Sequence, residues 1–287
     1  MHPEADPTPF LRHVQACNNA VLPGQRVPFR IAGEQVGWVL PDLATALGGF
    51  DPIAADPDGG LSLREPQALP QIARSLAGRG LARWRGETFD VRARPDGPVL
   101  AQIDRGSLPK FGIVSVGVHV NGLVESPAEA SSDPYIWIAY RSPSKALDPG
   151  KLDQIVAGGI PTGLSAEETL VKEAAEEADI PPALIRQVVP VATIAYAMDR
   201  AEGLRRDRLH CYDLSLPGDF RPRPNDDEVE RFELWPLSKI FATVRDTDKV
   251  KFNVNLVLID LFIRRGMFAP DAAAVLRAAL DDAARGQ

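Results

Sequence analysis

One segment, Ala157–Ile180 (AGGIPTGLSAEETLVKEAAEEADI), constrains the fold of this chain more than any other. It joins a glycine-rich stretch to a clear helix start, because Ser165 is a favourable N-cap and Glu168 three residues later completes a capping box. Apolar and small residues recur at helical spacing through Ser165–Ala178 and predict a face that packs on a sheet. The sequence therefore predicts a strand, a glycine-rich loop and a capped helix, in that order.

Three glutamates share one side of this helix. With about 100° per residue and Glu173 as the origin, Glu177 lies at about 40° and Glu176 at about 300°, so the carboxylates share an arc of about 100°. Repulsion between like charges at this spacing destabilises an exposed helix by about 0.2–0.5 kcal/mol per pair, and a bound divalent cation would turn this repulsion into a net attraction. Carboxylate oxygens suit Mg²⁺ or Mn²⁺. A helix with a merely solvated acidic face is the alternative, and the nearby glycines, which let backbone approach a ligand, favour the cation site.

The pattern of the chain changes near Pro109–Gly112. Residues 1–110 are predicted to form a smaller α+β accessory domain, with the first dozen residues as a loose arm and Arg83–Ala93 as a strand pair. Residues 111–287 are predicted to form a second α+β domain, in which helices pack on the faces of a mixed sheet. Its first strand, Ile113–Val120 (IVSVGVHV), alternates strictly and is expected to be half-buried. A polar turn is expected at Glu125–Pro134.

Charge and composition exclude several classes of function. The net charge is −7, and no basic stripe for nucleic acid is present, since residues 1–111 hold 12 basic and 12 acidic residues and residues 112–287 hold 20 and 27. The apolar runs are too short to span a membrane, and acids and prolines stand where a signal peptide needs basic and apolar residues. A cytoplasmic protein without nucleic-acid or membrane partners is expected. Cys17 and Cys211 provide no disulfide framework and are expected to be buried apolar side chains.

The spacing of Gly158, Glu173, the Glu176–Glu177 pair and Ile180 resembles the Nudix box, commonly written GX5EX7REUXEEXGU, where U is aliphatic. Four positions depart from that pattern: Leu164 replaces Glu, Lys172 replaces Arg, Ala174 replaces the larger aliphatic residue and Asp179 replaces Gly. Lys172 can still neutralise the negative charge of the helix, although its ammonium group cannot donate the two parallel hydrogen bonds of an arginine guanidinium.

The resemblance extends beyond the box through FGIVSVGVHVNG, YIWIAYRS, GKLDQIVAGGIPTGLS and HCYDLSLPGDFRP. These segments are similar to a Nudix subfamily with an extra N-terminal domain, which includes plant Nudix hydrolases and the Nudix-like part of fungal thiamin pyrophosphokinase proteins. The resemblance implies a Nudix fold, with a mixed β-sheet sandwiched between helices, and divalent-metal-dependent cleavage of a diphosphate linkage in oxidised or damaged thiamin diphosphate. The expected partner is a small-molecule diphosphate, and a second copy of the chain, in a homodimer, is a further candidate partner.

Three alternatives stay open at this point. The substrate could instead be another nucleoside-diphosphate-linked molecule such as ADP-ribose. The chain could also be a Nudix-fold binding module with little turnover, as the departures at Leu164 and Asp179 suggest. An isopentenyl-diphosphate isomerase-like role would need a cysteine acid opposite a glutamate, and neither Cys17 nor Cys211 lies in a recognisable motif.

The resemblance also implies roles for the residues of the box. Glu173 and Glu177 would be the principal metal ligands, and Glu176 would bind a second ion or orient water. The carbonyl oxygen of Gly158 would be a further ligand. Glu173 is the default general base. Because Glu176 would orient water, the catalytic residues expected are Glu173 and Glu176.

Residues outside the box complete the predicted site. Glu228, within Asn225–Glu230 (NDDEVE), is the expected further metal ligand, and a solvated acidic turn is the alternative. Arg141 and Lys151 are candidates for binding substrate phosphates. Stacking partners for a substrate ring are also available in strands, although aromatic residues there are usually core residues: Trp137, Tyr196, Phe232 and Trp235.

Overall fold

The computed structural model describes residues 3–125 and 133–285. The strands of its large sheet are β7 (Val114–Val124), β8 (Tyr135–Arg141), β9 (Leu152–Asp153), β10 (Val156–Gly159), β11 (Val189–Arg200), β12 (Gly203–Ser215) and β13 (Val229–Pro236). The strand order is β11-β12-β7-β8-β13, with β10 paired to β7 and β9 to β8. The sheet is mixed because β12 runs parallel to β7, whereas β11, β8 and β10 run antiparallel to their neighbours. The turn expected at Glu125–Pro134 lies largely outside the described residues.

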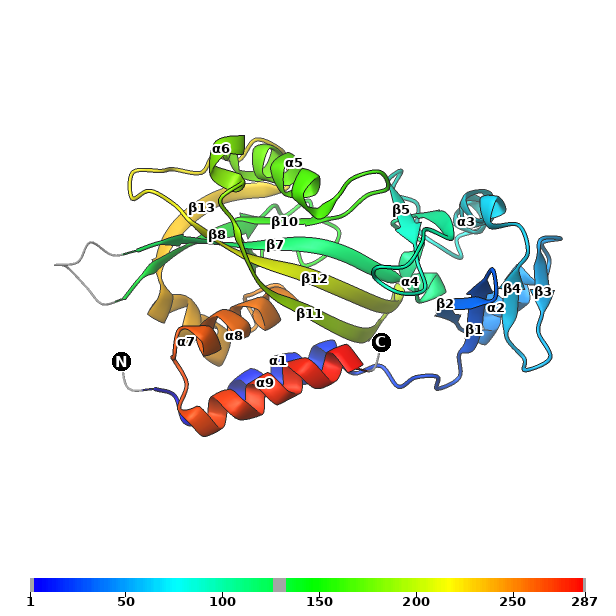
Figure 1. Ribbon diagram of the computed structural model, residues 1–287, viewed down its shortest axis with the longest axis horizontal. Helices are drawn as coiled ribbons and strands as arrows, with labels where there is room; N and C mark the ends of the chain where they lie inside the picture. The colour runs from blue at the N-terminus through cyan, green and yellow to red at the C-terminus, as the bar shows by residue number, and fades with distance from the viewer. Residues whose placement is uncertain (1–2, 126–132, 286–287) are drawn as a thin grey trace.

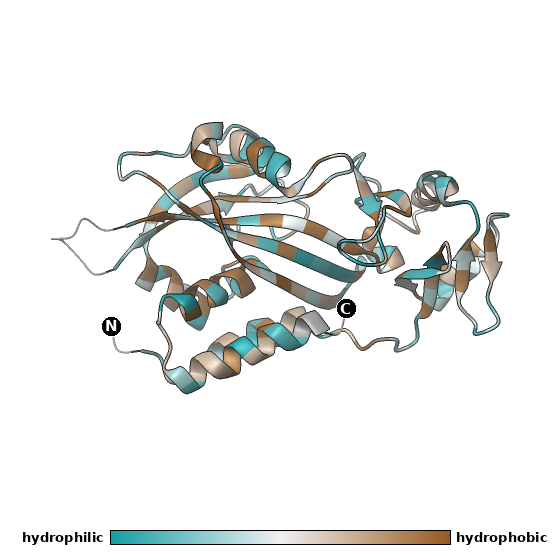
Figure 2. Cartoon of the chain, viewed as in Figure 1, coloured by the Kyte–Doolittle hydropathy of each residue, from teal (hydrophilic) through white to brown (hydrophobic). Residues whose placement is uncertain are grey.

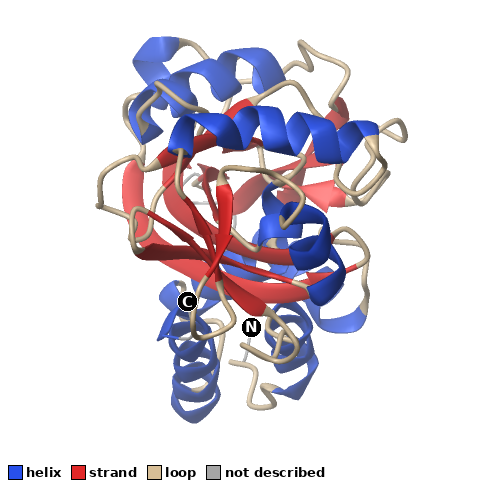
Figure 3. Ribbon diagram, turned by 90° about the vertical axis from the view of Figure 1, so that its right-hand side faces the viewer, coloured by secondary structure: helices blue, strands red, loops and turns tan. Residues whose placement is uncertain are grey.

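Helices cover both faces of this sheet (Figures 1 and 3). The helices on one face are α5 (Ala166–Ala178) and α6 (Pro182–Ile185), and those on the other are α1 (Thr8–Cys17), α7 (Leu237–Asp246), α8 (Val254–Arg264) and α9 (Pro270–Arg285). The predicted α+β class, with a mixed sheet sandwiched between helices, is confirmed.

The first long strand, β7, is more buried than its alternating sequence predicts. Residues 117–124 are buried on both faces of the sheet, so the expectation of a half-buried strand is wrong for this part. The reason is the double cover of helices: Val118 and Val120 pack with α5, while Leu123 packs with α7 and α8. Helix α8, which is brown along much of its length in Figure 2, is buried on all sides for the same reason.

The N-terminal segment is a packed helix, and the expectation of a loose arm is wrong. Phe10 and Cys17 of α1 are fully buried in the same cluster as α7, α8 and α9. The ring of Phe10 contacts that of Phe241 at a tilt of 47° and that of Phe268 edge-to-face, with ring centroids 4.9 and 4.8 Å apart. The apolar spacing of Phe10, Val14 and Cys17 carried the signal for this helix.

Residues 27–113 form a second cluster of buried side chains. Its elements are β1 (Val27–Ile31), β2 (Glu34–Val39), α2 (Pro41–Leu47), β3 (Ile53–Ala55), β4 (Leu61–Leu63), η1 (Pro66–Ala68), α3 (Leu69–Gly78), β5 (Thr88–Val91), β6 (Ala101–Asp104) and α4 (Leu108–Phe111). The small sheet has the order β2-β1-β4-β3, and β5 pairs with β6. The strand pair expected within Arg83–Ala93 is therefore wrong, because the partner of β5 lies ten residues downstream at Ala101–Asp104. We refer to residues 27–113 as the N-terminal domain.

Candidate active site

Helix α5 begins as the sequence predicts. The Ser165 hydroxyl accepts a hydrogen bond from the Glu168 N–H at 3.2 Å, and the Glu168 carboxylate accepts one from the Ser165 N–H at 2.8 Å. Both halves of the capping box are thus present. The helix ends at Asp179, which has the left-handed φ of 52°. Leu170, Ala174 and the other small residues of its inner face pack on the sheet, which fixes the direction of the glutamates.

Strand β10 carries the glycine pair at 158 and 159, where a loop was predicted; that expectation is wrong. The two residues pair with Val118 and Gly117 of β7. A β-carbon on Gly158 would lie 2.4 Å from the Cδ atom of Glu173. The glycine is therefore required for a close approach of this carboxylate to the strand.

Two of the predicted glutamates are brought together at this strand. Glu177 is buried, and its Oε2 atom accepts a hydrogen bond from the Ala157 N–H at 2.8 Å. Glu173 lies one helical turn earlier against Gly158, and its side chain is only 13% exposed. We refer to Glu173 and Glu177 as the carboxylate pair.

The third glutamate points elsewhere. The side chain of Glu176 is 51% exposed and forms an ion pair with Lys172 at 2.7 Å. Lys172 also binds Glu173 at 3.0 Å, so this lysine neutralises the helix as expected of a substitute for arginine. The structure therefore does not place Glu176 with the carboxylate pair.

Burial shifts the titration of the carboxylate pair. Burial raises the pKa of Glu177 well above its usual 4.5; the Ala157 N–H opposes this rise and the charge of Glu173 adds to it. Burial also raises the pKa of Glu173, while the positive charges of Lys172 and Arg105 oppose the rise. A divalent cation would compensate the free-energy cost of burying each of the two negative charges, so the residues present fit such an ion.

The carboxylate pair does not by itself complete a metal centre. Within residues 3–125 and 133–285, no group of three or more His, Cys, Asp or Glu side chains is arranged to hold an ion. Mg²⁺ is usually held by one or two carboxylates, with substrate phosphates and water as the other ligands. A pair is therefore compatible with an ion that binds together with a substrate.

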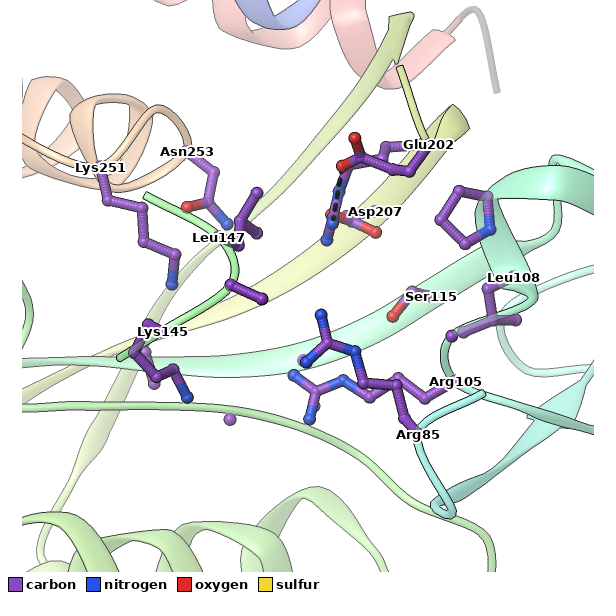
Figure 4. Close-up of a pocket in the computed structure, with 18 of the residues that line it drawn as sticks. Arg85, Arg105, Leu108, Ser115, Lys145, Leu147, Glu202, Asp207, Lys251 and Asn253 are labelled. Carbon is purple, nitrogen blue, oxygen red and sulfur yellow. Dashed lines mark hydrogen bonds and ion pairs between the residues drawn. The ribbon is translucent and has the colours of Figure 1, made fainter. Parts of the chain in front are cut away.

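A pocket of about 360 Å³ opens beside Ala157, Gly158 and Gly159 (Figure 4). Glu173 and Glu177 are not among the lining residues, but they contact Gly158 and Ala157, which are. Glu228 lines it and forms an ion pair with Lys145; burial would raise the pKa of Glu228, but Lys145 lowers it below the usual value. The described lining includes eight basic side chains (Arg83, Arg85, Arg105, Arg141, Lys145, Arg205, Arg206 and Lys251) and three acidic ones (Glu202, Asp207 and Glu228).

The two predicted phosphate-binding residues differ in position. Arg141 lines the pocket, but its guanidinium donates to Asp153 at 2.7 Å and to the carbonyl oxygens of Leu147 and Asp148. Lys151 does not line the pocket, and its nearest ion-pair partner is Asp148 at 3.9 Å. The geometry thus leaves Arg141 engaged within the protein.

The aromatic residues considered from the sequence belong to the interior. Trp137, Tyr196 and Trp235 are buried, and neither they nor Phe232 lines the pocket. Phe252, which the sequence analysis missed, does line it.

Both cysteines are buried and free, as expected. Burial raises the pKa of Cys17 to about 12 and also raises that of Cys211. Neither cysteine lines the pocket, which disfavours an isomerase-like cysteine acid.

Several other pocket residues escaped the sequence analysis. Arg85 and Arg105 come from the N-terminal domain, and Lys145, Lys251 and Asn253 come from loops of the second half. Asn253 is 5% exposed, and among the described residues its Oδ1 atom has no hydrogen-bond partner. One signal was available: residues 1–111 contain eleven arginines and one lysine, and arginine is the residue best suited to binding phosphate.

Comparison with known proteins identifies the family of this chain. The NUDIX domain family matches residues 120–255, and a domain of unknown function, DUF4743, matches residues 9–115. Nudix hydrolase 24, chloroplastic, of Arabidopsis thaliana is 34% identical over 284 residues, which cover 95% of this chain and 77% of that protein. The chain belongs to the Nudix hydrolase family. The Nudix hydrolase 20, chloroplastic, of the same plant is 33% identical over 291 residues, with the same coverage.

These relatives confirm the predicted Nudix fold with an extra N-terminal domain, and they confirm a pyrophosphohydrolase. Among solved structures, the Nudix fold here is similar to that of the DR0079 protein from Deinococcus radiodurans, at 21% identity and a TM-score of 0.43, over 67% of this chain and 99% of that one. Nudix hydrolases generally use divalent metal ions.

The Nudix relatives in Arabidopsis are named as chloroplastic, so a cytoplasmic location stays an expectation. None of the helices in the described part of the chain is long and apolar enough to cross a bilayer.

Proposed function

We propose that this Nudix pyrophosphohydrolase uses Mg²⁺ or Mn²⁺ to cleave the diphosphate linkage of a small molecule, with oxidised or otherwise damaged thiamin diphosphate as the preferred substrate. The observation that carries the proposal is the carboxylate pair, packed on Ala157 and Gly158 beside a pocket with basic walls. The thiamin assignment rests on the sequence resemblance, and ADP-ribose is the alternative.

The carboxylate pair would hold the cation. When bound, the ion would neutralise charge on the diphosphate and lower the pKa of a coordinated water. The Ala157 N–H fixes one oxygen of Glu177, and Gly158 leaves room for Glu173. The Gly158 carbonyl stays a proposed further ligand.

Proton transfer is assigned to Glu173. This assignment follows the resemblance to the Nudix box, because the water that a cation activates needs a nearby carboxylate to accept its proton. Glu176, paired with Lys172 and half exposed, is proposed to orient water or steer Lys172 rather than bind the first ion. Glu228 is proposed to act from the pocket side, where Lys145 keeps it ionised.

The pocket has features that would accept a heteroaromatic ring. Phe252 supplies an apolar surface, and the Oδ1 atom of Asn253, which has no hydrogen-bond partner among the described residues, is an acceptor for a ring amino group. Thiamin and adenine both carry such a group, so these residues support both candidate substrates.

A panel assay tests the proposal. Cleavage of oxidised thiamin diphosphates, ADP-ribose and dinucleotide polyphosphates is measured with Mg²⁺ by chromatography of the products, for the wild-type protein, Glu177→Gln and Glu176→Gln. We expect wild-type turnover to fall by about 100-fold or more in Glu177→Gln and by about 10-fold or less in Glu176→Gln. Wild-type turnover no greater than that of Glu177→Gln would instead identify a binding module. Faster turnover of ADP-ribose than of any thiamin compound would overturn the thiamin assignment.

A further inference from the structure

The N-terminal domain packs directly on the residues that precede α5. Thr162, in the loop between β10 and α5, donates its N–H to the Thr88 carbonyl at 2.8 Å and its hydroxyl to Asp90 at 3.0 Å. The ring of Phe89 lies 2.6 Å from where a β-carbon on Gly159 would be. Strand β5 is therefore in contact with the segment that carries the Nudix glycines.

One buried carboxylate fixes two loops of this domain at the pocket. Asp104 accepts hydrogen bonds from the N–H groups of Arg85 (2.8 Å), Gly86 (2.7 Å) and Gly106 (2.8 Å). Asp104 is 3% exposed, so these bonds are shielded from water. The backbone positions from which Arg85 and Arg105 extend are thus held by the same anchor.

The two arginines extend into the pocket (Figure 4). Arg105 pairs with Glu87 at 2.8 Å and lies over the Phe89 ring at 5.6 Å, which limits its orientation. Arg85 forms no ion pair with any residue in the described ranges. One guanidinium is therefore oriented and the other is available to an external anion.

The charge of the pocket opposes the charge of the chain. Among the described lining residues, basic side chains outnumber acidic ones by eight to three, whereas the whole chain carries −7. Such a concentration of positive charge attracts an anionic ligand to this site. A guanidinium group donates two parallel hydrogen bonds to phosphate oxygens, and a diphosphate has acceptor oxygens that point in several directions.

We infer that Arg85 and Arg105 bind the diphosphate group of the substrate, so that the N-terminal domain supplies the phosphate-binding wall of the active site. The inference rests on the proposed function in that it names the residues which receive the same diphosphate. It assigns a role to the N-terminal domain, which would bind the diphosphate group of the substrate.

Binding of a non-hydrolysable probe tests the inference separately from catalysis. Imidodiphosphate with Mg²⁺ is titrated calorimetrically into the wild-type protein, Arg85→Gln, Arg105→Gln and the double variant. Arg79→Gln is the matched control, because Arg79 is an exposed arginine of the same domain that does not line the pocket. We expect Kd to rise about 10-fold for each single variant and about 100-fold for the double variant, with no change for the control. Arg105→Lys should recover only part of the affinity, since it keeps the charge without the fork.

Steady-state kinetics with the best substrate of the panel supplies the second readout. We expect the KM of the double variant to rise by at least 10-fold while kcat changes by less than about 3-fold. This result is expected when a variant loses an interaction that stabilises the bound substrate and the transition state equally. Unchanged Kd and KM in the double variant, or no binding of imidodiphosphate to the wild-type protein, would overturn the inference. If the wild-type protein hydrolyses no diphosphate but binds the probe through these arginines, the proposed function fails and the inference stands.

Discussion

The Cδ atom of Glu173 lies 2.4 Å from the point that a β-carbon on Gly158 would occupy. Gly158→Ala must therefore move the Glu173 carboxylate. Because the clash is with the end of a flexible side chain, the fold should survive. We expect kcat to fall by about 100-fold with Tm nearly unchanged, since a misplacement of about 1 Å can cost that much in rate.

The measurement is the rate of product formation from the best substrate of the panel, together with a thermal scan. Gly78→Ala is the control, because among the described residues no atom outside its own helix and chain neighbours lies within 4 Å of its would-be β-carbon, and Gly78 does not line the pocket. Full activity in Gly158→Ala would show that the position of Glu173 does not matter for catalysis.

Glu177 is predicted to lower the stability of the metal-free protein. Burial raises the pKa of Glu177 above the usual 4.5. At a pH between 4.5 and the raised pKa, Glu177 therefore keeps its proton in the folded protein, whereas the unfolded chain has released it. Stability must then fall as pH rises through this window. Glu177→Gln cannot ionise, and its side-chain oxygen can still accept the Ala157 N–H. We expect this variant to be about 1 kcal/mol more stable near neutral pH, with Tm about 2–4 °C higher.

Thermal scans from about pH 5 to pH 8, with a chelator and with Mg²⁺, check this expectation. The advantage of Glu177→Gln should shrink toward low pH and in the presence of Mg²⁺, which should raise the Tm of the wild-type protein alone. Glu176→Gln, at a half-exposed position, should change stability by less than about 0.5 kcal/mol. A wild-type Tm that does not respond to Mg²⁺, either alone or together with imidodiphosphate, would contradict the metal assignment.

The sequence predicted the helix of the site and two of its glutamates because both depend on local rules. The capping box of Ser165 and Glu168 fixes where α5 begins, and the helical period fixes the relative directions of its side chains. The period does not say where the neighbouring strand lies. Glu173 and Glu177 face β10, whereas Glu176, within the same predicted arc, reaches Lys172 and solvent.

The rest of the site depends on contacts between distant segments. Arg85 and Arg105 lie in loops of the N-terminal domain, and their place in the pocket follows from the contacts of Thr88 and Phe89 with the second half of the chain. No local periodicity encodes such a contact. The burial of α1 was missed because it depends on contacts with α8 and α9, which lie at the other end of the chain.

Asp179 occupies the position where the Nudix box has glycine, with a left-handed φ of 52°. Only glycine adopts this conformation without strain, although aspartate tolerates it better than most residues. We expect Asp179→Gly to change stability little, within about 0.5 kcal/mol, because relief of strain is offset by greater entropy of the unfolded chain. Asp179→Ala should cost about 1 kcal/mol. Urea unfolding of the wild-type protein, Asp179→Gly and Asp179→Ala gives the order of their free energies of unfolding. Equal stability of the Ala and Gly variants would show that the helix ends without strain.

A buried charge cluster beneath the pocket should be sensitive to one substitution and tolerant of another. Asp153 accepts hydrogen bonds from Arg141 at 2.7 Å and from Lys251 at 3.0 Å, and all three side chains are buried. Burial alone would raise the pKa of Asp153, but the charges of Lys251 and Arg141 outweigh it and lower the value to about 2. Asp153→Asn leaves two buried cations without a counter-ion and should cost about 3–5 kcal/mol, whereas Lys251→Met keeps the Arg141 pair and should cost about 1 kcal/mol or less.

The pH dependence separates this electrostatic account from a simple packing defect. The folded-state pKa of Asp153 is depressed, so its stabilising contribution is complete above its ordinary value of 3.8 and is lost as pH falls toward about 2. Free energies of unfolding from urea titrations at pH 7 and pH 3 should therefore show a large gap between wild type and Asp153→Asn at pH 7 and a smaller one at pH 3. Lys251→Met serves as the control, because it leaves Asp153 paired with Arg141 at both pH values. A gap of the same size at both pH values would mean that Asp153 stabilises the fold through shape and hydrogen bonding rather than through its charge.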